Sequence, residues 1–375
     1  MKALFHMTLG DRLSGAENVL WTYLRHADHD RVEPVFVGVR GALARDVAEL
    51  GVRTYALPGG RLREAPRTAA NVVRFARILR AERPDVIVNW LTKAQLYGGP
   101  ASALAGLGAR NMWWQHDFPN GRLGDRIATL LPTRAIVACS SAVADEQARL
   151  RPRRRCLFVL AGIEEPRRAP DAELDELRAQ LSLPPRVPIA GMLGRLIPWK
   201  GQHHFIGALA QLREAGVPVH GLIVGGDAYG MAPEYARELR DLTARLGLES
   251  HVTFTGHVRE PARHLQLMDV AVNASAREPF GVVLLEAMAL GVPVVAVDAA
   301  GPREIVEPGR SGMLASSADP AELRRAIDPV LGNDDLARRL SAGGRARFES
   351  RFTARRMATE IQSRLADVAA APEQR

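Results

Sequence analysis

The sequence predicts an α/β protein built from two doubly wound parallel sheets, each covered by helices on both faces. Strand and helix patterns alternate along almost the whole chain, and a stretch rich in Gly, Pro and charge interrupts them at residues 161–170. The length of 375 residues, 47% of them hydrophobic, is enough for two separate cores. We therefore expect an N-terminal domain over residues 1–165, a second domain over 166–350 and a C-terminal helical segment over 351–375.

Buried strands are predicted where short apolar runs stand between turn signals. In the first half the predicted strands are Lys2–Met7, Pro34–Val39, Arg53–Leu57, Asp85–Asn89, Asn111–Gln115, Ala135–Cys139 and Cys156–Leu160. In the second half they are Pro188–Leu193, Val219–Val224, His251–Thr255, Val270–Ala274 and Pro293–Val297. Because helical patterns separate most of these strands, both sheets should be parallel, and two such domains should face each other across a cleft.

Local signals also predict where three helices begin or end. Gly291 ends an apolar helix over Val282–Leu290. Asp319-Pro320-Ala321-Glu322 combines an acidic cap, a proline at the first helical position and a following glutamate, which together indicate a helix start. The last helix is predicted over Ala354–Val368, followed by a frayed tail over residues 369–375.

The charge does not indicate a nucleic-acid-binding protein. The net charge of +8 comes almost entirely from arginine, since Lys2, Lys93 and Lys200 are the only lysines. Binding to DNA or RNA would require basic residues on one face with aromatic platforms nearby. The only dense basic cluster is residues 151–155, which we interpret as a solvated connection; contact with acidic lipid or an anionic acceptor is the weaker alternative.

Cysteine content and the N-terminus restrict the setting of the protein. Cys139 and Cys156 are too few and too poorly spaced for a disulfide framework or a metal site. The first strand lacks the apolar length and cleavage site of a signal peptide. We therefore expect a cytoplasmic protein and leave open whether it touches the inner face of the membrane.

Two glutamates eight positions apart, Glu278 and Glu286, are the most informative feature for function. Glu278 lies on a loop after the predicted strand Val270–Ala274, and Glu286 lies on the next helix. In open α/β sheets, ligands bind at the carboxyl ends of strands, where helix N-termini also present free N–H groups. Both carboxylates could thus accept hydrogen bonds from ligand hydroxyls. The alternative is a solvated loop charge and a helix residue paired with an arginine.

A second candidate element lies between the strand ending at Leu193 and the helix that begins near Gln202. Arg195 offers a planar guanidinium group and Lys200 a compact ammonium group, and together they suit the two negative centres of a diphosphate. The alternative is a basic surface loop without a function. The presence of Lys200 argues against it, because this chain uses arginine for almost every other positive charge. Two further glycine turns fit the same pocket, one containing Gly225 and the other the segment Thr255–Val258.

The first half of the chain contains candidates for a second substrate. One residue of this half, Gly15, is instead a candidate for donor binding, because it ends a loop after the first strand and could bring backbone N–H groups to a phosphate or sugar oxygen. His116 ends the predicted strand Asn111–Gln115 and is followed by Asp117, although a lone histidine is more often structural. The pocket lining is predicted to include Trp90, Lys93, Trp113, Trp114 and Asn120, with core packing as the alternative for the tryptophans.

The run Arg277–Gly291 resembles the E-x7-E motif of the family 4 glycosyltransferases, which are retaining enzymes with the two-domain GT-B fold. The resemblance implies that Glu278 contacts the transferred sugar and Glu286 holds the nucleotide ribose. It also implies that the backbone at Phe280, Gly281 and Val282 touches the sugar hydroxyls.

Other segments are similar to the same family. Gly194–Gly201 resembles the G-R-x(n)-K-G element, which implies that Arg195 and Lys200 stabilise the departing diphosphate. The base would lie against the backbone near His257 and Val258. The loop Gly10–Glu17 resembles the family's G-G-A-E loop, with Ser14 in place of the first glycine, and His116-Asp117 resembles the active-site His-Asp pair.

We therefore expect a retaining glycosyltransferase that moves a sugar from a UDP- or GDP-sugar, held by the second domain, to an acceptor hydroxyl held by the first. The acceptor would be a small molecule, a glycan or a lipid, and no cofactor, metal or nucleic acid is expected. The usual metal-binding D-x-D motif is missing in a plausible place, because Asp28-His29-Asp30 lies in a surface connection. The last helix is expected to cross back to the first domain.

Three other functions fit parts of the sequence. A sugar-nucleotide epimerase or hydrolase could use the same fold. An NAD-dependent dehydrogenase would need G-x-G-x-x-G, but Asp227 stands where its second glycine should be. A protein that binds anionic surfaces or nucleic acids would rest on the net charge alone.

Overall fold

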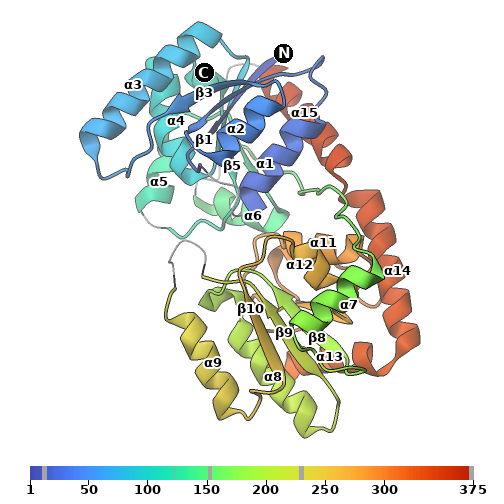
Figure 1. Cartoon of the computed structure of the whole chain (residues 1–375). Coiled ribbons are helices and arrows are strands. Elements are labelled where there is room, and N and C mark those ends of the chain that lie inside the picture. The colour runs from blue at the N-terminus through green and yellow to red at the C-terminus, as the bar shows by residue number, and fades with distance from the viewer. Residues whose placement is uncertain (11–14, 122, 151–153, 228–231, 371–375) are drawn as a thin grey trace. The chain divides into compact units, whose positions relative to one another are not determined.

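The computed structural model describes residues 1–10, 15–121, 123–150, 154–227 and 232–370 (Figure 1). The chain forms two compact units, one of Met1–Gly162 with Ala354–Arg375 and the other of Ile163–Thr353. Each described unit contains one parallel sheet, of seven strands in the first unit and six in the second. The predicted α/β class with two doubly wound sheets is confirmed.

The strands of the N-terminal unit follow the order β3-β2-β1-β4-β5-β6-β7. Their bounds are β1 (Lys2–Met7), β2 (Glu33–Val39), β3 (Arg53–Leu57), β4 (Val86–Trp90), β5 (Asn111–Gln115), β6 (Ala135–Ala138) and β7 (Cys156–Phe158). The order reverses between β1 and β4, which are neighbours in parallel register. Because crossovers between parallel strands are right-handed, this reversal puts helices on both faces of the sheet.

The helices of this unit include one from the end of the chain. They are α1 (Gly15–His26), α2 (Ala42–Glu49), α3 (Ala65–Glu82), α4 (Thr92–Leu104), the short η1 (Gly108–Arg110), α5 (Leu123–Leu130), α6 (Ser141–Leu150) and α15 (Ala354–Ala370). Helix α15 packs against α1, and Gln362 Nε2 donates to the carbonyl oxygen of Asp28 at 2.8 Å. Residues 369 and 370 continue α15 instead of fraying, while residues 371–375 lie outside the described chain.

A buried polar cluster holds the middle of the N-terminal sheet together. His6 Nδ1 is 2.9 Å from Asn89 Oδ1. Gln95 Oε1, on α4, accepts from Asn89 Nδ2 and from Asn111 Nδ2, at 3.1 Å each. Because each of these side chains is buried, the shared hydrogen bonds offset their desolvation and fix β1, β4, β5 and α4 in one arrangement.

The C-terminal unit has the strand order β10-β9-β8-β11-β12-β13. Its strands are β8 (Ile189–Leu193), β9 (His220–Val224), β10 (Val252–Gly256), β11 (Val270–Asn273), β12 (Val294–Val297) and β13 (Met313–Ala315). Its helices are α7 (Asp171–Gln180), η2 (Pro198–Lys200), α8 (Gln202–Glu214), α9 (Tyr235–Arg245), α10 (Pro261–Leu265), α11 (Val282–Ala289), α12 (Ala300–Ile305), α13 (Pro320–Gly332) and α14 (Asp334–Arg351).

The local predictions for this unit hold with small differences. Strand β13 is not predicted from the sequence, because three residues between turns carry no periodic signal. Helix α13 is capped as expected, since the Asp319 carboxylate accepts from the N–H of Ala321 at 2.8 Å. Glu322 does not complete a capping box, because it accepts instead from the Ser316 hydroxyl.

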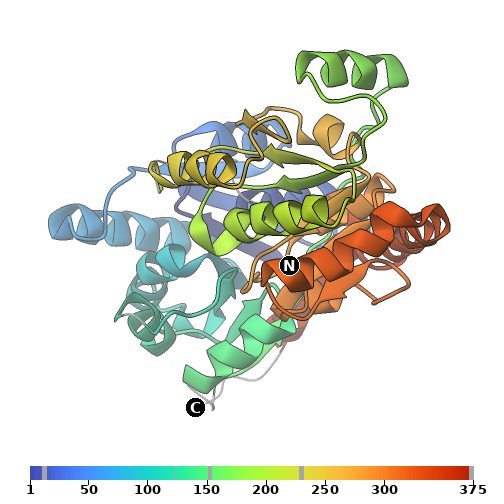
Figure 2. The same cartoon turned by 90° about the horizontal axis from the view of Figure 1, so that it is seen from below.

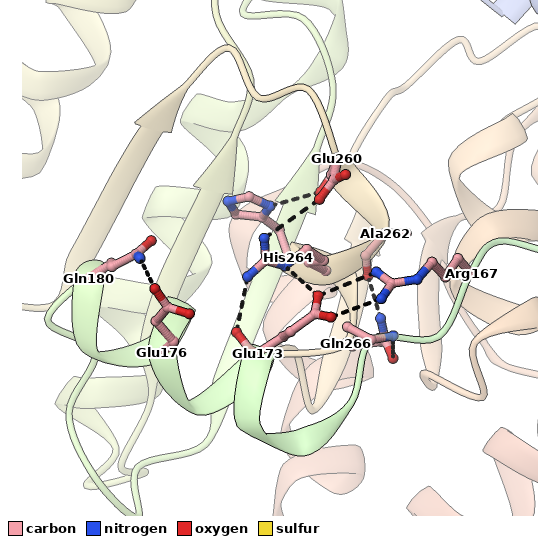
Figure 3. A network of polar contacts seen from close by, with 10 residues as sticks. Arg167, Glu173, Glu176, Gln180, Glu260, Ala262, His264 and Gln266 are labelled. Atoms are coloured by element: carbon pink, nitrogen blue, oxygen red, sulfur yellow. Dashed lines mark hydrogen bonds and ion pairs between the residues drawn. The ribbon is translucent and has the colours of Figure 1, made fainter.

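Helix α7 lies at the periphery of its unit, outside the layers that cover the sheet (Figure 2). Ionic contacts hold it to α10. Glu173, on α7, forms an ion pair of 2.8 Å with Arg167 and one of 3.7 Å with Arg263 (Figure 3). The backbone also contributes a contact, because Ala169 N–H donates to Gln266 Oε1 at 3.1 Å. These exposed contacts position α7 without a large apolar interface.

Candidate functional site

The sugar-nucleotide candidates of the C-terminal unit gather at one edge of its sheet. The strand order reverses between β8 and β11, which are neighbours. The loop after β8 carries Lys200 and the loop after β11 carries Glu278. The loops after β9 and β10 carry Gly225 and His257. This edge is the topological switch point, where open α/β sheets bind ligands.

Lys200 and Glu278 form a buried ion pair at this switch point. Lys200 Nζ lies 2.6 Å from Glu278 Oε2, and their side chains are 19% and 7% exposed. The same oxygen accepts from the Ser275 hydroxyl at 3.0 Å and from Asn273 Nδ2 at 3.3 Å. No described residue donates to the other carboxylate oxygen, Oε1. Glu278 is thus held through one oxygen and offers the second to a ligand.

Lys200 also keeps donors for a ligand. An ammonium group has three N–H donors, and Glu278 is its only hydrogen-bond partner among the residues that the structure describes. The ammonium group also lies 4.3 Å from the ring centroid of Trp199, a cation–π contact that limits its range of positions. Lys200 can therefore bind an anion without releasing Glu278.

Two glycines allow the loops at this edge to approach one another closely. Gly201 has φ of 79°, and a Cβ atom there would lie 2.3 Å from the carbonyl oxygen of Ala274. Gly225 has φ of 138°, and a Cβ atom there would lie 1.9 Å from the carbonyl oxygen of Gly194. A side chain at either position would push the loops after β8, β9 and β11 apart.

Glu286 is a half-buried carboxylate on α11. Among the described residues none donates a hydrogen bond to it and none forms an ion pair with it, so the alternative of an arginine partner is not observed. Burial raises the pKa of Glu286 to about 7. The neighbouring helix residues are apolar and buried, so no local group offsets the loss of solvation. A carboxylate in this state favours a ligand that brings hydroxyl donors.

The backbone candidates lie around this pair of glutamates. Phe280 is buried, and Gly281 precedes α11 in a left-handed conformation. No side chain caps α11, and the Leu284 N–H donates to the carbonyl oxygen of Gly281 at 2.9 Å, so the N–H groups of Val282 and Val283 are those of the first turn that remain for a ligand. His257 is exposed and Val258 half-buried on the loop after β10, and Arg195 is half-buried on the loop after β8.

In the N-terminal unit, His116 follows β5 directly and is surrounded by aromatic rings. Its ring centroid lies 4.9 Å from that of Trp90 and 6.5 Å from that of Trp114. Burial lowers the pKa of His116 to about 3, so the imidazole is neutral at physiological pH. Its Nε2 is buried and has no hydrogen-bond partner in the described chain. This nitrogen is the available polar atom of the group.

Trp90 supports this arrangement from below. It is fully buried and stacks on Trp114 with ring centroids 4.5 Å apart. Its indole N–H donates to the carbonyl oxygen of Ala16 at 2.9 Å, which fixes the start of α1 next to Gly15. Trp90, Trp113 and Trp114 have almost no exposed surface, so core packing accounts for them. Residues 11–14 of the loop before Gly15 lie outside the described chain.

Lys93 lines a small cavity formed with residues at the ends of β1, β2 and β3. Burial lowers the pKa of Lys93, whose ammonium group donates to the carbonyl oxygen of Gly60 at 3.1 Å. Two other residues of the lining, Thr8 and Asn71, each have a buried side-chain oxygen without a hydrogen-bond partner. The cavity therefore presents an ammonium donor, a hydroxyl and an amide oxygen.

Asp117 and Asn120 are exposed on the loop between β5 and α5. The backbone N–H of Asn120 donates to Asp125 Oδ2 at 2.8 Å, which ties this loop to α5. The predicted site residues thus form two groups, one around Lys200, Glu278 and Glu286, and the other around His116 and Lys93.

Four residues of these sites are not predicted from the sequence. Asn273 and Ser275 hold Glu278, and polar residues at the end of a buried strand and just beyond it are the signal that could have revealed them. Thr8 and Asn71 line the cavity near Lys93; Thr8 follows β1 and had the same signal, whereas Asn71 lies on α3 and had none. In the described residues, no group of three His, Cys, Asp or Glu side chains is arranged to hold a metal ion.

Two family models match the chain in succession. Residues 13–164 match the model described as Glycosyltransferase Family 4, and residues 174–347 match the model described as Glycosyl transferases group 1. The two matches together cover most of the chain and correspond to the two units.

The curated relatives of the chain are also named as glycosyltransferases. The chain is 27% identical over 285 residues to the lipopolysaccharide core biosynthesis glycosyltransferase LpsE of Rhizobium meliloti. This match covers 75% of each of the two chains. It is 36% identical over 201 residues to the D-inositol 3-phosphate glycosyltransferase of Geodermatophilus obscurus, covering 51% of this chain but only 43% of the relative.

A solved structure matches almost the whole chain. The Anabaena protein HepE, crystallised with UDP and glucose, superposes with a TM-score of 0.82 at 26% identity, covering 98% of this chain and 99% of HepE. HepE was also crystallised with UDP-glucose. Family models, relatives and fold agree: this chain belongs to the group 1 glycosyltransferases, in family 4, and has the GT-B fold.

Proposed function

We propose that this glycosyltransferase transfers a sugar from a UDP- or GDP-sugar to an acceptor hydroxyl with retention of configuration. The observation that carries this proposal is the polar constellation at the switch point of the C-terminal sheet. Glu278 keeps one carboxylate oxygen without a donor from the described chain, Lys200 keeps N–H donors, and Glu286 is a carboxylate without a described partner. A nucleoside diphosphate sugar has the groups that complete all three.

Each part of the donor would meet a different part of this constellation. Sugar hydroxyls would donate to Glu278 Oε1 and accept from the first N–H groups of α11, near Phe280 and Gly281. The ribose hydroxyls would donate to Glu286, and ionisation of this carboxylate would strengthen those hydrogen bonds. The base would lie against the backbone at His257 and Val258, with Gly225 leaving room for the nucleotide. The crystal structures of HepE with UDP and with UDP-glucose support a uridine nucleotide.

In the proposed reaction the bond between the anomeric carbon and the diphosphate oxygen breaks as the acceptor oxygen attacks from the same face. The acceptor proton passes to the departing phosphate oxygen, and the products are the glycoside and a nucleoside diphosphate. Arg195 and Lys200 would stabilise the charge that develops on the leaving group, which is the largest electrostatic demand of this reaction. We propose that these cations suffice without a metal ion.

The N-terminal unit would bind the acceptor. A neutral His116 with an unpaired Nε2 can form a hydrogen bond to a hydroxyl without attracting a phosphate, and Gly15 would contribute backbone N–H groups. The cavity at Lys93 would take an anionic or hydroxyl-rich substituent of the acceptor, and the exposed Asp117 and Asn120 would lie at its periphery. The similarity to LpsE, a lipopolysaccharide core biosynthesis glycosyltransferase, supports a glycan or glycolipid acceptor. For such an acceptor we also propose a peripheral contact with the membrane.

A thermal-shift panel tests the donor site first. UDP, GDP, ADP and dTDP, each with its common sugars, are added to the wild type, Glu286→Ala and Lys200→Ala. One nucleotide should raise the melting temperature, because a ligand that binds only the folded state stabilises it by mass action, and both variants should weaken the shift. If no nucleotide shifts the melt of the wild type, the proposed donor site is wrong.

Product analysis then separates transfer from its alternatives. A hydrolase releases nucleoside diphosphate without an acceptor, whereas a transferase requires one. The anomeric configuration of the product, measured by NMR, tests retention, and unchanged turnover in EDTA tests metal independence. An inverted product or a rate restored only by a divalent cation would contradict the corresponding part of the proposal.

A further inference from the structure

Helix α5, in the N-terminal unit, exposes its apolar side chains and buries its polar and small ones, the reverse of an ordinary amphipathic helix. Its exposed residues are Leu123, Arg126, Ile127 and Leu130, and the three apolar side chains are 73%, 41% and 69% exposed. The spacing i, i+4 and i+7 places these three on one helical face. Apolar side chains that gather on a solvent-facing stripe of a helix mark an interaction surface.

Hydrogen bonds prevent α5 from turning its apolar face inward. The opposite face is polar or small: Asp125, Ala128 and Thr129 are buried. The Asp125 carboxylate accepts from the N–H of Asn120 at 2.8 Å, and the Thr129 hydroxyl accepts from Gln147 Nε2 at 3.1 Å. Rotating the helix would break these bonds and leave buried polar groups unsatisfied, so the exposed leucines are a fixed feature of this fold.

The exposed charge on α5 itself is positive. Arg126 lies on the exposed stripe, and no described residue forms an ion pair with it. At the C-terminal end of α5, Arg154 donates to the carbonyl oxygens of Thr129 and Leu131, at 3.3 and 3.4 Å. Arg155 follows and is exposed, whereas the only acidic residue of α5, Asp125, is buried. The exposed face of α5 thus combines apolar side chains with arginine and lacks a carboxylate of its own.

We propose that the face formed by Leu123, Arg126, Ile127 and Leu130 docks on a membrane that contains anionic lipid. The leucines and the isoleucine would enter the boundary between headgroups and acyl chains, and the arginines would contact lipid phosphates. Three aliphatic side chains on an eight-residue helix are too few for a second copy of the chain, because a stable protein interface buries about 800 Å² per partner. No helix of the described chain has the length and apolar character needed to cross a membrane.

This inference deepens the peripheral membrane contact proposed above by naming the surface that makes it. Vesicle flotation with full-length protein tests it, using phosphatidylcholine vesicles with and without one-third phosphatidylglycerol. The wild type should float with the anionic vesicles, more weakly at high salt. The double variant Leu123→Asp/Leu130→Asp should bind at least about tenfold more weakly, since two apolar insertions are lost and two negative charges added.

Leu246→Asp is the matched control, because Leu246 is 40% exposed at the end of α9 in the other unit. It should bind vesicles like the wild type. A wild type that ignores anionic vesicles, or a double variant that binds them unchanged, would overturn the proposal. So would dimerisation of the wild type that the double variant abolishes, measured by light scattering.

Nucleotide binding distinguishes this proposal from the donor-site proposal. The nucleotide thermal shift should be the same in the wild type and in Leu123→Asp/Leu130→Asp, because α5 lies outside the unit that carries the donor site. Loss of vesicle binding with the nucleotide shift intact is the expected result. Vesicle binding without any nucleotide shift in the wild type would refute the donor site and leave the docking surface standing.

Discussion

The site around Lys200 and Glu278 and the site around His116 differ in charge. In the C-terminal unit, the buried Lys200–Glu278 pair presents charged groups to a ligand, and Glu286, whose pKa burial raises to about 7, becomes charged near neutral pH. In the N-terminal unit, burial lowers the pKa of His116 to about 3 and of His6 to about 4, so both imidazoles stay neutral. A site that must hold a diphosphate needs charge, whereas a site that must orient a hydroxyl needs a neutral hydrogen-bonding group. The difference matches the two halves of a transfer reaction.

The largest expected effect comes from separating the buried ion pair. Lys200→Met should destabilise the protein by roughly 3 kcal/mol, because it leaves the Glu278 carboxylate buried without its cation. It should also reduce turnover by about 10²- to 10³-fold, since a group that stabilises the leaving diphosphate is lost. Chemical denaturation and initial rates with a nucleotide sugar measure the two effects.

The double variant Lys200→Met/Glu278→Gln is the control for this prediction. Two neutral side chains of similar size remove the unpaired charge, so most of the lost stability should return while activity stays low. If the single variant is as stable as the wild type, the ion pair is not important for folding. If the double variant regains activity, neither residue has the proposed role.

Glu286→Gln tests the carboxylate with the raised pKa. The folded state binds the proton more tightly than the unfolded state, so the free energy of unfolding falls as pH rises from about 4.5 to about 7. Replacing Glu286 removes this loss. Between pH 5 and pH 8 the free energy of unfolding of the variant, relative to that of the wild type, should therefore rise by roughly 2 to 3 kcal/mol. Denaturation at both pH values measures the difference, and parallel curves would contradict it.

The same variant tests the ligand at Glu286. UDP-glucose should bind the wild type more tightly at pH 8 than at pH 6, because ionised Glu286 accepts stronger hydrogen bonds from ribose. UDP-glucose has no terminal phosphate group and therefore lacks the secondary phosphate ionisation of UDP, so the pH dependence of its binding reports the titration of the protein alone. In Glu286→Gln this pH dependence should disappear, as measured by calorimetry.

His116→Gln should have the opposite pH signature. The unfolded histidine takes up a proton below about pH 6.5, whereas the folded one stays neutral down to about pH 3, so stability falls as pH decreases. The variant should therefore lose roughly 2 kcal/mol less than the wild type between pH 7 and pH 5. Its turnover should fall at every pH, because the hydrogen bond to the acceptor is altered. Equal acid sensitivity of the two proteins would show that the imidazole is accessible to protons.

The smallest expected effect lies outside both sites, in the contacts that hold α7. Glu173→Gln, which removes the ion pair with Arg167 drawn in Figure 3, should leave the free energy of unfolding almost unchanged, since the two side chains are 34% and 67% exposed. Activity should not change. A larger loss of stability would mean that the packing of α7 depends on this network more than its exposure indicates.

The sequence by itself determined the fold class, the strands of both sheets except β13, and the loops that carry the site residues. Apolar periodicity reports which residues must be buried, and glycine turns report where strands end, so both signals are local. The position of Glu278 after β11 and of Lys200 after β8 followed from the same signals.

Only the tertiary structure decided how these residues pair. Lys200 and Glu278 are 78 positions apart, and no local pattern indicates that the lysine donates to one oxygen of the glutamate. Nor does any local pattern indicate that Glu286 has no partner among the described residues. The burial of Trp90, the cavity at Lys93 and the inverted orientation of α5 likewise depend on contacts between segments distant in sequence. Hydrogen bonds of this kind depend on distance and angle in space, and a sequence pattern specifies neither.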